Sequence, residues 1–302
     1  MTRRPWVWAL QALLLLAVAV LVWRSLHAHW DQFRTLDVRL TLHLGWIALA
    51  AAAVLPTYGL LIAAWRGIIT GWDQRLPYLP AVRIWTLSNL GRYLPGKVWS
   101  VAGLAVLAQR RGVAPWAAVG SAIVMQAVAV GSGVIVALAT VPGAASPLAF
   151  GAALVVAATL VLTFTMPGAA QLVARIIPGA DLRPLSPGAV LRATGATAVA
   201  WVGYGAAFWC LARGILGPTT LSLATASGVF AAGYLVGLLA IVAPGGVGVR
   251  EAVFLAFLTP ALGSGPALAL TVASRLLLTL TEALAAVAGL ALRERRDAAT
   301  SS

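Results

Sequence analysis

Long apolar segments constrain the fold of this chain more than any other feature of its sequence. A helix needs about 20 consecutive apolar residues to cross the hydrocarbon core of a bilayer. Hydrophobic residues make up 61% of the chain and charged residues 10%, whereas a soluble domain carries about 25% charged residues. The sequence therefore predicts an all-α polytopic membrane protein. The candidate spans are residues 6–26, 42–65, 114–139, 148–166, 190–211, 221–243 and 266–292.

Two further segments, residues 79–109 and 246–262, are interrupted or short. Arginines cluster in some of the loops, and the positive-inside rule places such loops in the cytoplasm. Counting 246–262 as a crossing gives about eight transmembrane helices with both termini in the cytoplasm. Segment 79–109 then enters and leaves on the cytoplasmic side as a re-entrant hairpin. Residues 1–292 would form a single membrane domain, and residues 293–302 a short charged cytoplasmic tail.

The charge balance fits a membrane location. The chain has 21 lysine and arginine residues against 8 aspartate and glutamate residues, which gives a net charge of +13. Membrane topology and attraction to anionic lipid headgroups account for this excess, so we expect no nucleic-acid partner. The single cysteine, Cys210, excludes an internal disulfide, and His27, His29 and His43 lack partners at metal-ligand spacing. We therefore expect neither a metal nor a cofactor.

Proline and glycine interrupt two otherwise apolar segments, and charged residues accompany both breaks. The first break reads Asn-Leu-Gly-Arg-Tyr-Leu-Pro-Gly-Lys over residues 89–97, and the second reads Pro-Gly-Gly-Val-Gly-Val-Arg-Glu over residues 244–251. Irregular backbone and fixed charge occur at membrane depth only where protein or a wet cavity surrounds them. Broken helices in matching places of two halves are typical of repeat-built transporters. The chain could therefore consist of two repeat halves, about 1–140 and 141–292.

The first break offers several hydrogen-bond donors. Asn89 and Arg92 would lie on one face of a helix, and Lys97 would lie in the opening turn of the next helix. Together with Tyr93 they would suit a phosphate diester. The alternative is that this segment anchors the chain at the membrane interface, with Arg92 reaching toward the headgroups.

The second break combines glycines with a helix start. Gly246 and Gly248 let the backbone turn sharply and approach a ligand closely. The helix that follows presents unpaired amide groups, which attract anions, and Arg250 adds a positive charge there. The functional interpretation is a phosphate or lipid-headgroup site. The alternative is a glycine-rich helix start whose Arg250 and Glu251 solvate a membrane edge.

The last span places two threonines, Arg275 and Glu282 on one helix face, at steps of four, four and three. Each charged residue would cost about 2.5–3.5 kcal/mol at a lipid-facing helix centre, so both must face the bundle interior. They are too far apart for an ideal direct pair. Glu251 could pair with Arg275, or Arg250 with Glu282, and this intramembrane ion network could be structural or take part in transport.

Four polar side chains in other spans complete the candidate set. Gln126, Ser121, Tyr204 and Tyr234 either line the same cavity or form hydrogen bonds between helices.

The two motifs, taken together, carry a family resemblance. Residues 89–99 and 244–251 resemble the membrane region of lysylphosphatidylglycerol synthases (multiple peptide resistance factors) and of stand-alone membrane proteins that share it. The similarity extends over roughly residues 6–292. In the synthases this region is associated with flipping aminoacylated phosphatidylglycerol between leaflets. The resemblance implies a helical bundle with re-entrant segments and a lipid cavity.

By position, Arg92, Lys97, Arg250 and Glu251 match the family motifs. The synthases carry a soluble aminoacyl-transferase domain after the membrane region, whereas this chain ends there. The resemblance therefore implies that lysyl transfer from tRNA is not expected and that this protein is not an enzyme.

These observations lead to one main hypothesis and two alternatives. We expect a bacterial inner-membrane lipid flippase or transporter-like protein that binds an anionic headgroup in an intramembrane cavity. Its partners would be membrane lipids of the anionic phospholipid or polyprenyl-phosphate type. The alternatives are a non-catalytic membrane partner subunit and a lipid-linked transferase. The sequence sets no oligomeric state.

Overall fold

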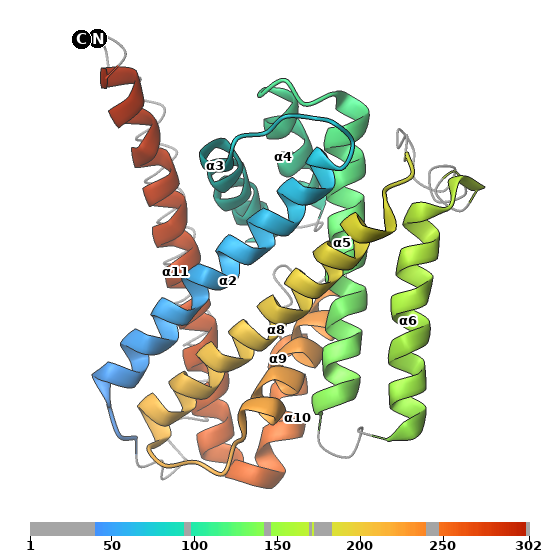
Figure 1. The fold of residues 1–302 in the computed structure, drawn as a ribbon. Coiled ribbons are helices and arrows are strands. Elements are labelled where there is room, and N and C mark those ends of the chain that lie inside the picture. Colours follow the sequence, from blue (N-terminus) through green and yellow to red (C-terminus); the bar gives the residue numbers. More distant parts are fainter. Residues whose placement is uncertain are drawn as a thin grey trace.

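The computed structural model describes residues 40–93, 98–141, 146–168, 171, 183–239 and 248–299. This part of the chain consists of nine α-helices and one 3-10 helix, without a strand (Figure 1). The predicted first span, residues 6–26, lies outside the described residues. In chain order the elements are α2 (Leu44–Thr70), α3 (Tyr78–Asn89), the 3-10 helix η1 (Leu90–Tyr93), α4 (Val98–Gln109), α5 (Pro115–Thr140), α6 (Pro147–Thr165), α8 (Pro187–Leu216), α9 (Leu223–Leu239), α10 (Val249–Leu262) and α11 (Ser264–Ala299).

Five helices are long and apolar enough to cross a membrane: α2, α5, α6, α8 and the first 27 residues of α11. These helices confirm the predicted class of an all-α membrane protein. The predicted count of eight spans is not reproduced among the described residues. Two further predicted spans correspond to α9 and α10. Helix α10 has 14 residues, which extend about 21 Å, less than the roughly 30 Å hydrocarbon core. Helix α9 is described over 17 residues, and the rest of its predicted span, residues 240–243, lies outside the described residues.

Local sequence signals fix where several of the long helices begin. Proline is the first residue of α5, α6 and α8, a position where its missing N–H costs nothing. Ser146 and Ser186 precede two of these prolines. Their hydroxyl groups accept hydrogen bonds from the backbone N–H groups of Ala149 at 3.1 Å and Ala189 at 3.3 Å. Such caps satisfy amide groups that a helix start otherwise leaves unpaired.

The helices α2 and α8 form the centre of the bundle and lie antiparallel, side by side (Figure 1). The start of α2 meets the end of α8, where the N–H of His43 donates to the carbonyl of Gly214 at 2.8 Å. Helices α5 and α9 pack against α8, while α6 packs against α5 and α8 and lies at the edge of the described bundle. Leu148 and Phe150 of α6 are 84% and 69% exposed, as expected for side chains that face lipid.

The first interrupted segment folds as a helical hairpin. Its two ends meet, because the N–H of Ala114 donates to Gln74 Oε1 at 3.0 Å and the rings of Trp72 and Trp116 lie 5.4 Å apart. Helices α3 and α4 have 12 residues each, about 18 Å, which is too short to cross a bilayer. The hairpin therefore enters and leaves the bundle at one end. That it is re-entrant in a membrane stays a prediction.

A glycine allows the tight turn inside this hairpin. A Cβ atom on Gly91 would lie 2.7 Å from the backbone nitrogen of Ser100, so a side chain at this position would collide with the start of α4. Glycine permits this close approach of two backbones, η1 against α4. The motif therefore brings the residues before and after the break together.

The second interrupted segment approaches from the other end. Helix α10 begins after Gly248, whose φ of +84° and ψ of −46° lie in a region that favours glycine. In Figure 1, α3 and α4 lie at the upper end of the bundle, whereas α10 lies at the lower end beside the start of α11. Helix α11 then runs to the upper end and continues to Ala299, so most of the predicted tail over 293–302 is helical.

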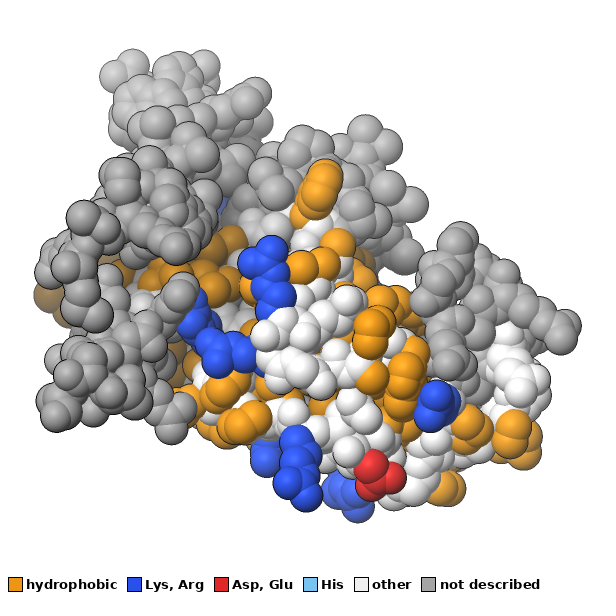
Figure 2. All heavy atoms as spheres, turned by 90° about the horizontal axis from the view of Figure 1, so that it is seen from above, with side chains coloured by type: hydrophobic (Ala, Val, Ile, Leu, Met, Phe, Trp, Pro, Cys, Tyr) orange, Lys and Arg blue, Asp and Glu red, His pale blue; other side chains and the backbone are white. Residues whose placement is uncertain are grey.

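The exposed arginines of the described loops lie at one end of the bundle. The loops before α3, before α5 and before α8 meet at one end, where Trp72 Nε1 donates to the carbonyl of Arg183 at 3.0 Å. Figure 2 views this end and shows basic side chains exposed on it. The exposed arginines in and beside these loops are Arg75, Arg110, Arg111, Arg183 and Arg192. At the opposite end, the described loop residues 40–43, 141, 146, 217–222 and 263 include no Lys, Arg, Asp or Glu, and Arg213 in the last turn of α8 is half-buried.

Candidate functional site

A cavity of about 190 Å³ lies inside the bundle, between the two interrupted segments. Its walls come from α2, α3, η1, α4, α5, α8, α9, α10 and α11, so segments from most of the described chain converge on it. Arginines from three different elements reach this space: Arg92 of η1, Arg250 of α10 and Arg275 of α11. A cavity inside a membrane-spanning bundle is a place where such charges are tolerated.

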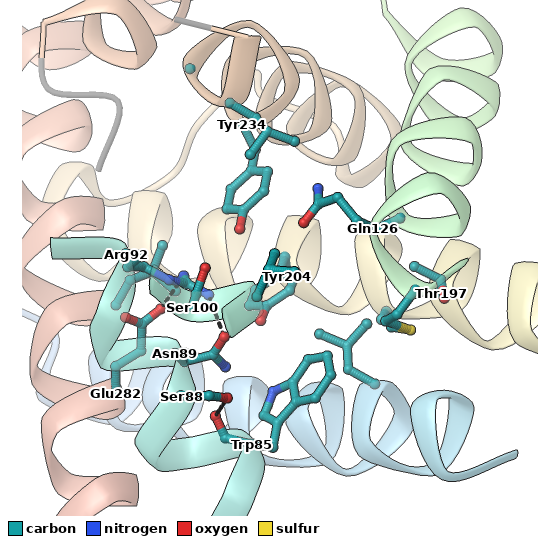
Figure 3. Close-up of a pocket in the computed structure, with 18 of the residues that line it drawn as sticks. Trp85, Ser88, Asn89, Arg92, Ser100, Gln126, Thr197, Tyr204, Tyr234 and Glu282 are labelled. Atoms are coloured by element: carbon teal, nitrogen blue, oxygen red, sulfur yellow. Dashed lines mark hydrogen bonds and ion pairs between the residues drawn. The ribbon is translucent and has the colours of Figure 1, made fainter. Parts of the chain in front are cut away.

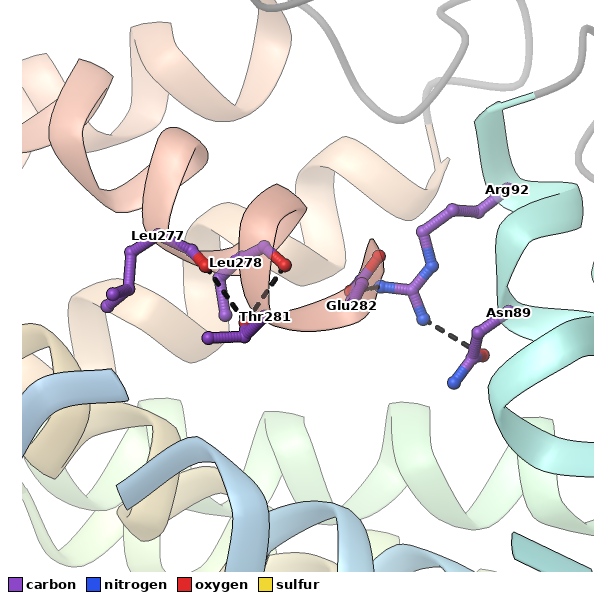
Figure 4. A network of polar contacts seen from close by, with 6 residues as sticks. All are labelled: Asn89, Arg92, Leu277, Leu278, Thr281 and Glu282. Carbon is purple, nitrogen blue, oxygen red and sulfur yellow. Dashed lines mark hydrogen bonds and ion pairs between the residues drawn. The ribbon is translucent and has the colours of Figure 1, made fainter. Parts of the chain in front are cut away.

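Arg92 bridges the first break to the last helix (Figure 4). Its Nη1 donates to Glu282 Oε1 at 2.6 Å, and its Nη2 donates to Asn89 Oδ1 at 3.0 Å. The Glu282 side chain is 5% exposed and that of Arg92 is 27% exposed. The neighbouring Thr281 turns its hydroxyl back onto its own helix, where it donates to the carbonyl oxygens of residues 277 and 278. Glu282 is thus the side chain through which this turn of α11 reaches the hairpin.

Glu251 joins the second break to the same helix. One of its carboxylate oxygens forms an ion pair with Arg275, and the other accepts the backbone N–H of Gly248 at 2.7 Å. Both oxygens are therefore engaged, and the carboxylate also lies at the positive end of α10. Of the two pairings that the sequence leaves open, the structure forms Glu251 with Arg275.

The other predicted pairing, Arg250 with Glu282, does not form, since Glu282 pairs with Arg92. Successive residues on a helix point about 100° apart, so Arg250 cannot follow Glu251 toward α11. Its guanidinium instead lies over the rings of Phe230 and Phe254, 5.0 Å from each centroid. Its Nη2 is buried and has no hydrogen-bond partner in the described part of the chain. Aromatic faces can stabilise a cation without neutralising it.

Neutral polar groups complete the walls (Figure 3). Gln126, Tyr204 and Tyr234 line the cavity, and the picture shows the Gln126 amide and the Tyr234 hydroxyl pointing into it. Ser121, the fourth candidate from other spans, does not line it. Its hydroxyl donates to a carbonyl of its own helix and accepts Trp65 Nε1 at 3.0 Å, so it connects two helices instead.

A family comparison agrees with this architecture. The family model of the lysylphosphatidylglycerol synthase TM region matches residues 8–286. The chain belongs to this family. No curated protein matches the chain. Membership in the lysylphosphatidylglycerol synthase TM region family relates the chain to membrane proteins of lipid modification or transport.

Within this family member, the structure brings five of the predicted site residues to one cavity. They are Asn89, Arg92, Arg250, Arg275 and Glu282. Other predicted residues support that set or cannot be placed. Glu251 and Gly248 hold the start of α10 and orient Arg275. Lys97 and Gly246 lie outside the described residues, and of Tyr93 only the backbone is described, within η1.

Sequence reasoning missed aromatic and hydroxyl groups that also line the cavity of this TM region. Trp85 reaches it from α3, and its Nε1 is buried without a hydrogen-bond partner in the described residues. Thr197 and Trp201 reach it from α8, on the same helix face as Tyr204. Their spacing of four and three residues is the signal that could have found them.

Proposed function

We propose that this protein moves an anionic lipid headgroup between the leaflets of a bacterial inner membrane through the central cavity. One observation carries the proposal: arginines from both interrupted segments and from α11 converge on one cavity inside an apolar bundle. Each such charge is costly at membrane depth, and intramembrane charges commonly mark a substrate path. The family relation to lipid modification or transport supports the same conclusion.

The arrangement of broken helices supports transport rather than static binding. Helices α4 and α10 follow breaks in the two segments that reach the cavity from opposite ends of the bundle. Helix N-termini carry partial positive charge, which adds to the attraction of the arginines for a phosphate group. Glu282 and Arg275 tie both segments to α11. A shift of α11 against the remaining helices would therefore move both segments together and expose the site alternately.

The state of the carboxylates favours this function over a lipid-linked transferase. Among the described lining residues Glu282 is the one acid, and it is paired with Arg92. Glu251 is held by Arg275 and a backbone amide. A general base needs a carboxylate that is free to accept a proton at the reacting atom. The geometry is better suited to holding a headgroup than to transforming it.

Leaflet exchange in reconstituted vesicles tests the proposal. Purified protein would be placed in phosphatidylcholine vesicles with fluorophore-labelled phosphatidylglycerol, and the fraction of label reached by an impermeant quencher would be followed over time. We expect exchange above that of protein-free vesicles, slowed by about 10–100-fold in Arg250→Gln, because a charge-assisted hydrogen bond contributes roughly 1.5–3 kcal/mol.

Arg213 provides a matched control. It also lies over aromatic rings, those of Trp46 and Trp209, and it does not line the cavity. Arg213→Gln should exchange lipid like the parent protein. Equal rates in the parent, in Arg250→Gln and in empty vesicles would refute transport. A chemically altered lipid without exchange would favour a transferase, and a stable co-purifying protein without exchange would favour a partner subunit.

A further inference from the structure

We infer that the cavity accepts a headgroup with a single phosphate and uncharged hydroxyl groups, and that it rejects headgroups bearing ammonium groups. This inference rests on the proposed function, because it specifies which lipids the same site takes. It departs from what the family name suggests, since a lysyl ester carries two ammonium groups. Two properties of the cavity support it, its charge balance and its neutral polar groups, and its volume accommodates such a headgroup.

The charge balance of the described residues leaves one uncompensated cation. Three arginines and two glutamates of the described chain lie at or beside the cavity, and three minus two leaves one positive charge. Lys97 lies outside the described residues and is not included in this count. Arg92 and Arg275 are each paired with a glutamate, so the excess belongs to Arg250. Its guanidinium is held by aromatic rings and has a buried nitrogen without a hydrogen-bond partner among the described residues. One phosphate diester, with one negative charge, would neutralise it.

Among the described residues, an ammonium group would find no unpaired carboxylate in this space. Glu251 uses both oxygens, and Glu282 is paired with Arg92. The undescribed segments next to the cavity helices, residues 94–97 and 240–247, contain no acidic residue in the sequence. Of the remaining acids, Asp73 lies exposed in the loop after α2, and the others lie at 31, 37, 181, 294 and 297. An unpaired Arg250 would repel an ammonium group at close range.

Neutral groups face the rest of the space. The side chains of Gln126, Tyr204 and Tyr234 form no hydrogen bond with another described residue. Trp85 Nε1 is also buried without a hydrogen-bond partner among the described residues. These groups can donate to hydroxyl oxygens, and the amide oxygen and phenol oxygens can accept from hydroxyl protons. The rings of Trp201 and Tyr234 lie 5.1 Å apart and add an apolar surface against which the carbon side of a polyol could pack.

The volume limits the size of the headgroup. The cavity measures about 190 Å³, and a cavity of about 150 Å³ holds a molecule the size of benzene. A glycerol unit or one sugar ring beside the phosphate would fill it.

Binding in detergent tests this inference separately from transport. Native mass spectrometry would measure retention of three lipids with the same acyl chains: phosphatidylglycerol, lysyl-phosphatidylglycerol and phosphatidylethanolamine. We expect phosphatidylglycerol to bind at least tenfold more tightly than either ammonium-bearing lipid. Arg250→Gln should lower phosphatidylglycerol retention at least tenfold, and Arg213→Gln should leave it unchanged.

A nearly isosteric exchange would probe selectivity directly. Gln126→Glu places a carboxylate on the cavity wall, so the ratio of lysyl-phosphatidylglycerol to phosphatidylglycerol binding should rise at least tenfold. Gln109→Glu makes the same change at the end of α4, outside the cavity, and should leave the ratio unchanged. Melting temperatures of both variants would check that the fold is retained.

The outcomes separate the two proposals. Equal binding of all three lipids by the parent protein would overturn the headgroup inference, even where vesicles show leaflet exchange. Selective phosphatidylglycerol binding without exchange in vesicles would overturn transport and keep the headgroup inference. Retention of none of the three lipids above background would overturn both.

Discussion

Arg250 differs from the other cavity arginines because aromatic rings, and not a carboxylate, hold it in place. Arg92 and Arg275 also have a structural role. Each forms an ion pair that connects a broken segment to α11. At the residue scale the site therefore divides into positioning ion pairs and one cation available for a ligand. Substitutions of these three arginines should affect stability and lipid handling to different extents.

The Arg92–Glu282 pair allows a quantitative test by a double-mutant cycle. Glu282→Gln should lower the free energy of unfolding by about 1.5–3 kcal/mol, the usual contribution of a hydrogen bond to a charged group. The larger cost of a fully buried pair is not expected, because Arg92 is 27% exposed. Arg92→Gln combined with Glu282→Gln should cost less than the sum of the single changes, because no unpaired charge remains. Thermal or denaturant unfolding in detergent would measure this.

An exposed acid gives the control for that cycle. Asp73→Asn removes one negative charge on the surface and should change stability by less than about 0.5 kcal/mol. Strictly additive effects of the Arg92 and Glu282 changes would mean that the two side chains do not interact.

The sequence reveals some residue contacts and hides others for a physical reason. A charged residue in an apolar helix must find a partner, so the sequence could name Glu251 with Arg275 as one of two candidate pairs. The partner of Glu282 could not, because Arg92 lies 190 positions away and no local pattern reports that distance. The contact of Arg250 with the rings of Phe230 and Phe254 could not be predicted either, since phenylalanines in α9 and α10 do not differ in the sequence from other apolar residues.

At the scale of elements, helix type and position follow from apolar length, whereas topology depends on packing. Residues 114–139 are predicted as a span, and the helix found is Pro115–Thr140. Residues 246–262 are also counted as a crossing, but the helix found there, Val249–Leu262, has 14 residues. Apolar composition cannot distinguish a crossing helix from a shorter buried one, because both are surrounded by apolar groups.

The α3–α4 hairpin predicts a defined pattern of chemical accessibility. Cys210 is the single cysteine, so a Cys210→Ala background permits cysteine labelling with an impermeant maleimide. Arg75→Cys and Arg111→Cys stand before and after the hairpin and should react from the same side of the membrane, since the ends of this segment meet.

Thr220→Cys, in the loop between α8 and α9, serves as the reference for the other side. It should react only from the side opposite to the two hairpin positions. Labelling of positions 75 and 111 from different sides would show that the segment between them crosses the membrane.

For the whole molecule, the uneven distribution of charge predicts orientation. The end that carries the exposed arginines should be cytoplasmic, and α11 runs toward that end. A phosphatase reporter fused after residue 302 should therefore be inactive in the parent protein, because this enzyme is active only outside the cytoplasm. Replacing Arg75, Arg110 and Arg111 by glutamine should raise reporter activity, and Arg213→Gln should not. An active reporter on the parent protein would reverse the orientation.

The single excess charge of the cavity also has an electrical meaning. Moving a unit charge across the membrane changes its electrostatic energy by about 2.3 kcal/mol for every 100 mV of membrane potential. In the proposed transport cycle, the described residues of a cavity that holds a monoanionic headgroup against Arg250 would carry no net charge, so reorientation would do no work against the voltage. The same residues of the unoccupied cavity would carry one positive charge on reorientation. The resting potential of a cell would thus act on the return of the empty protein and draw the cavity toward the negative, cytoplasmic face.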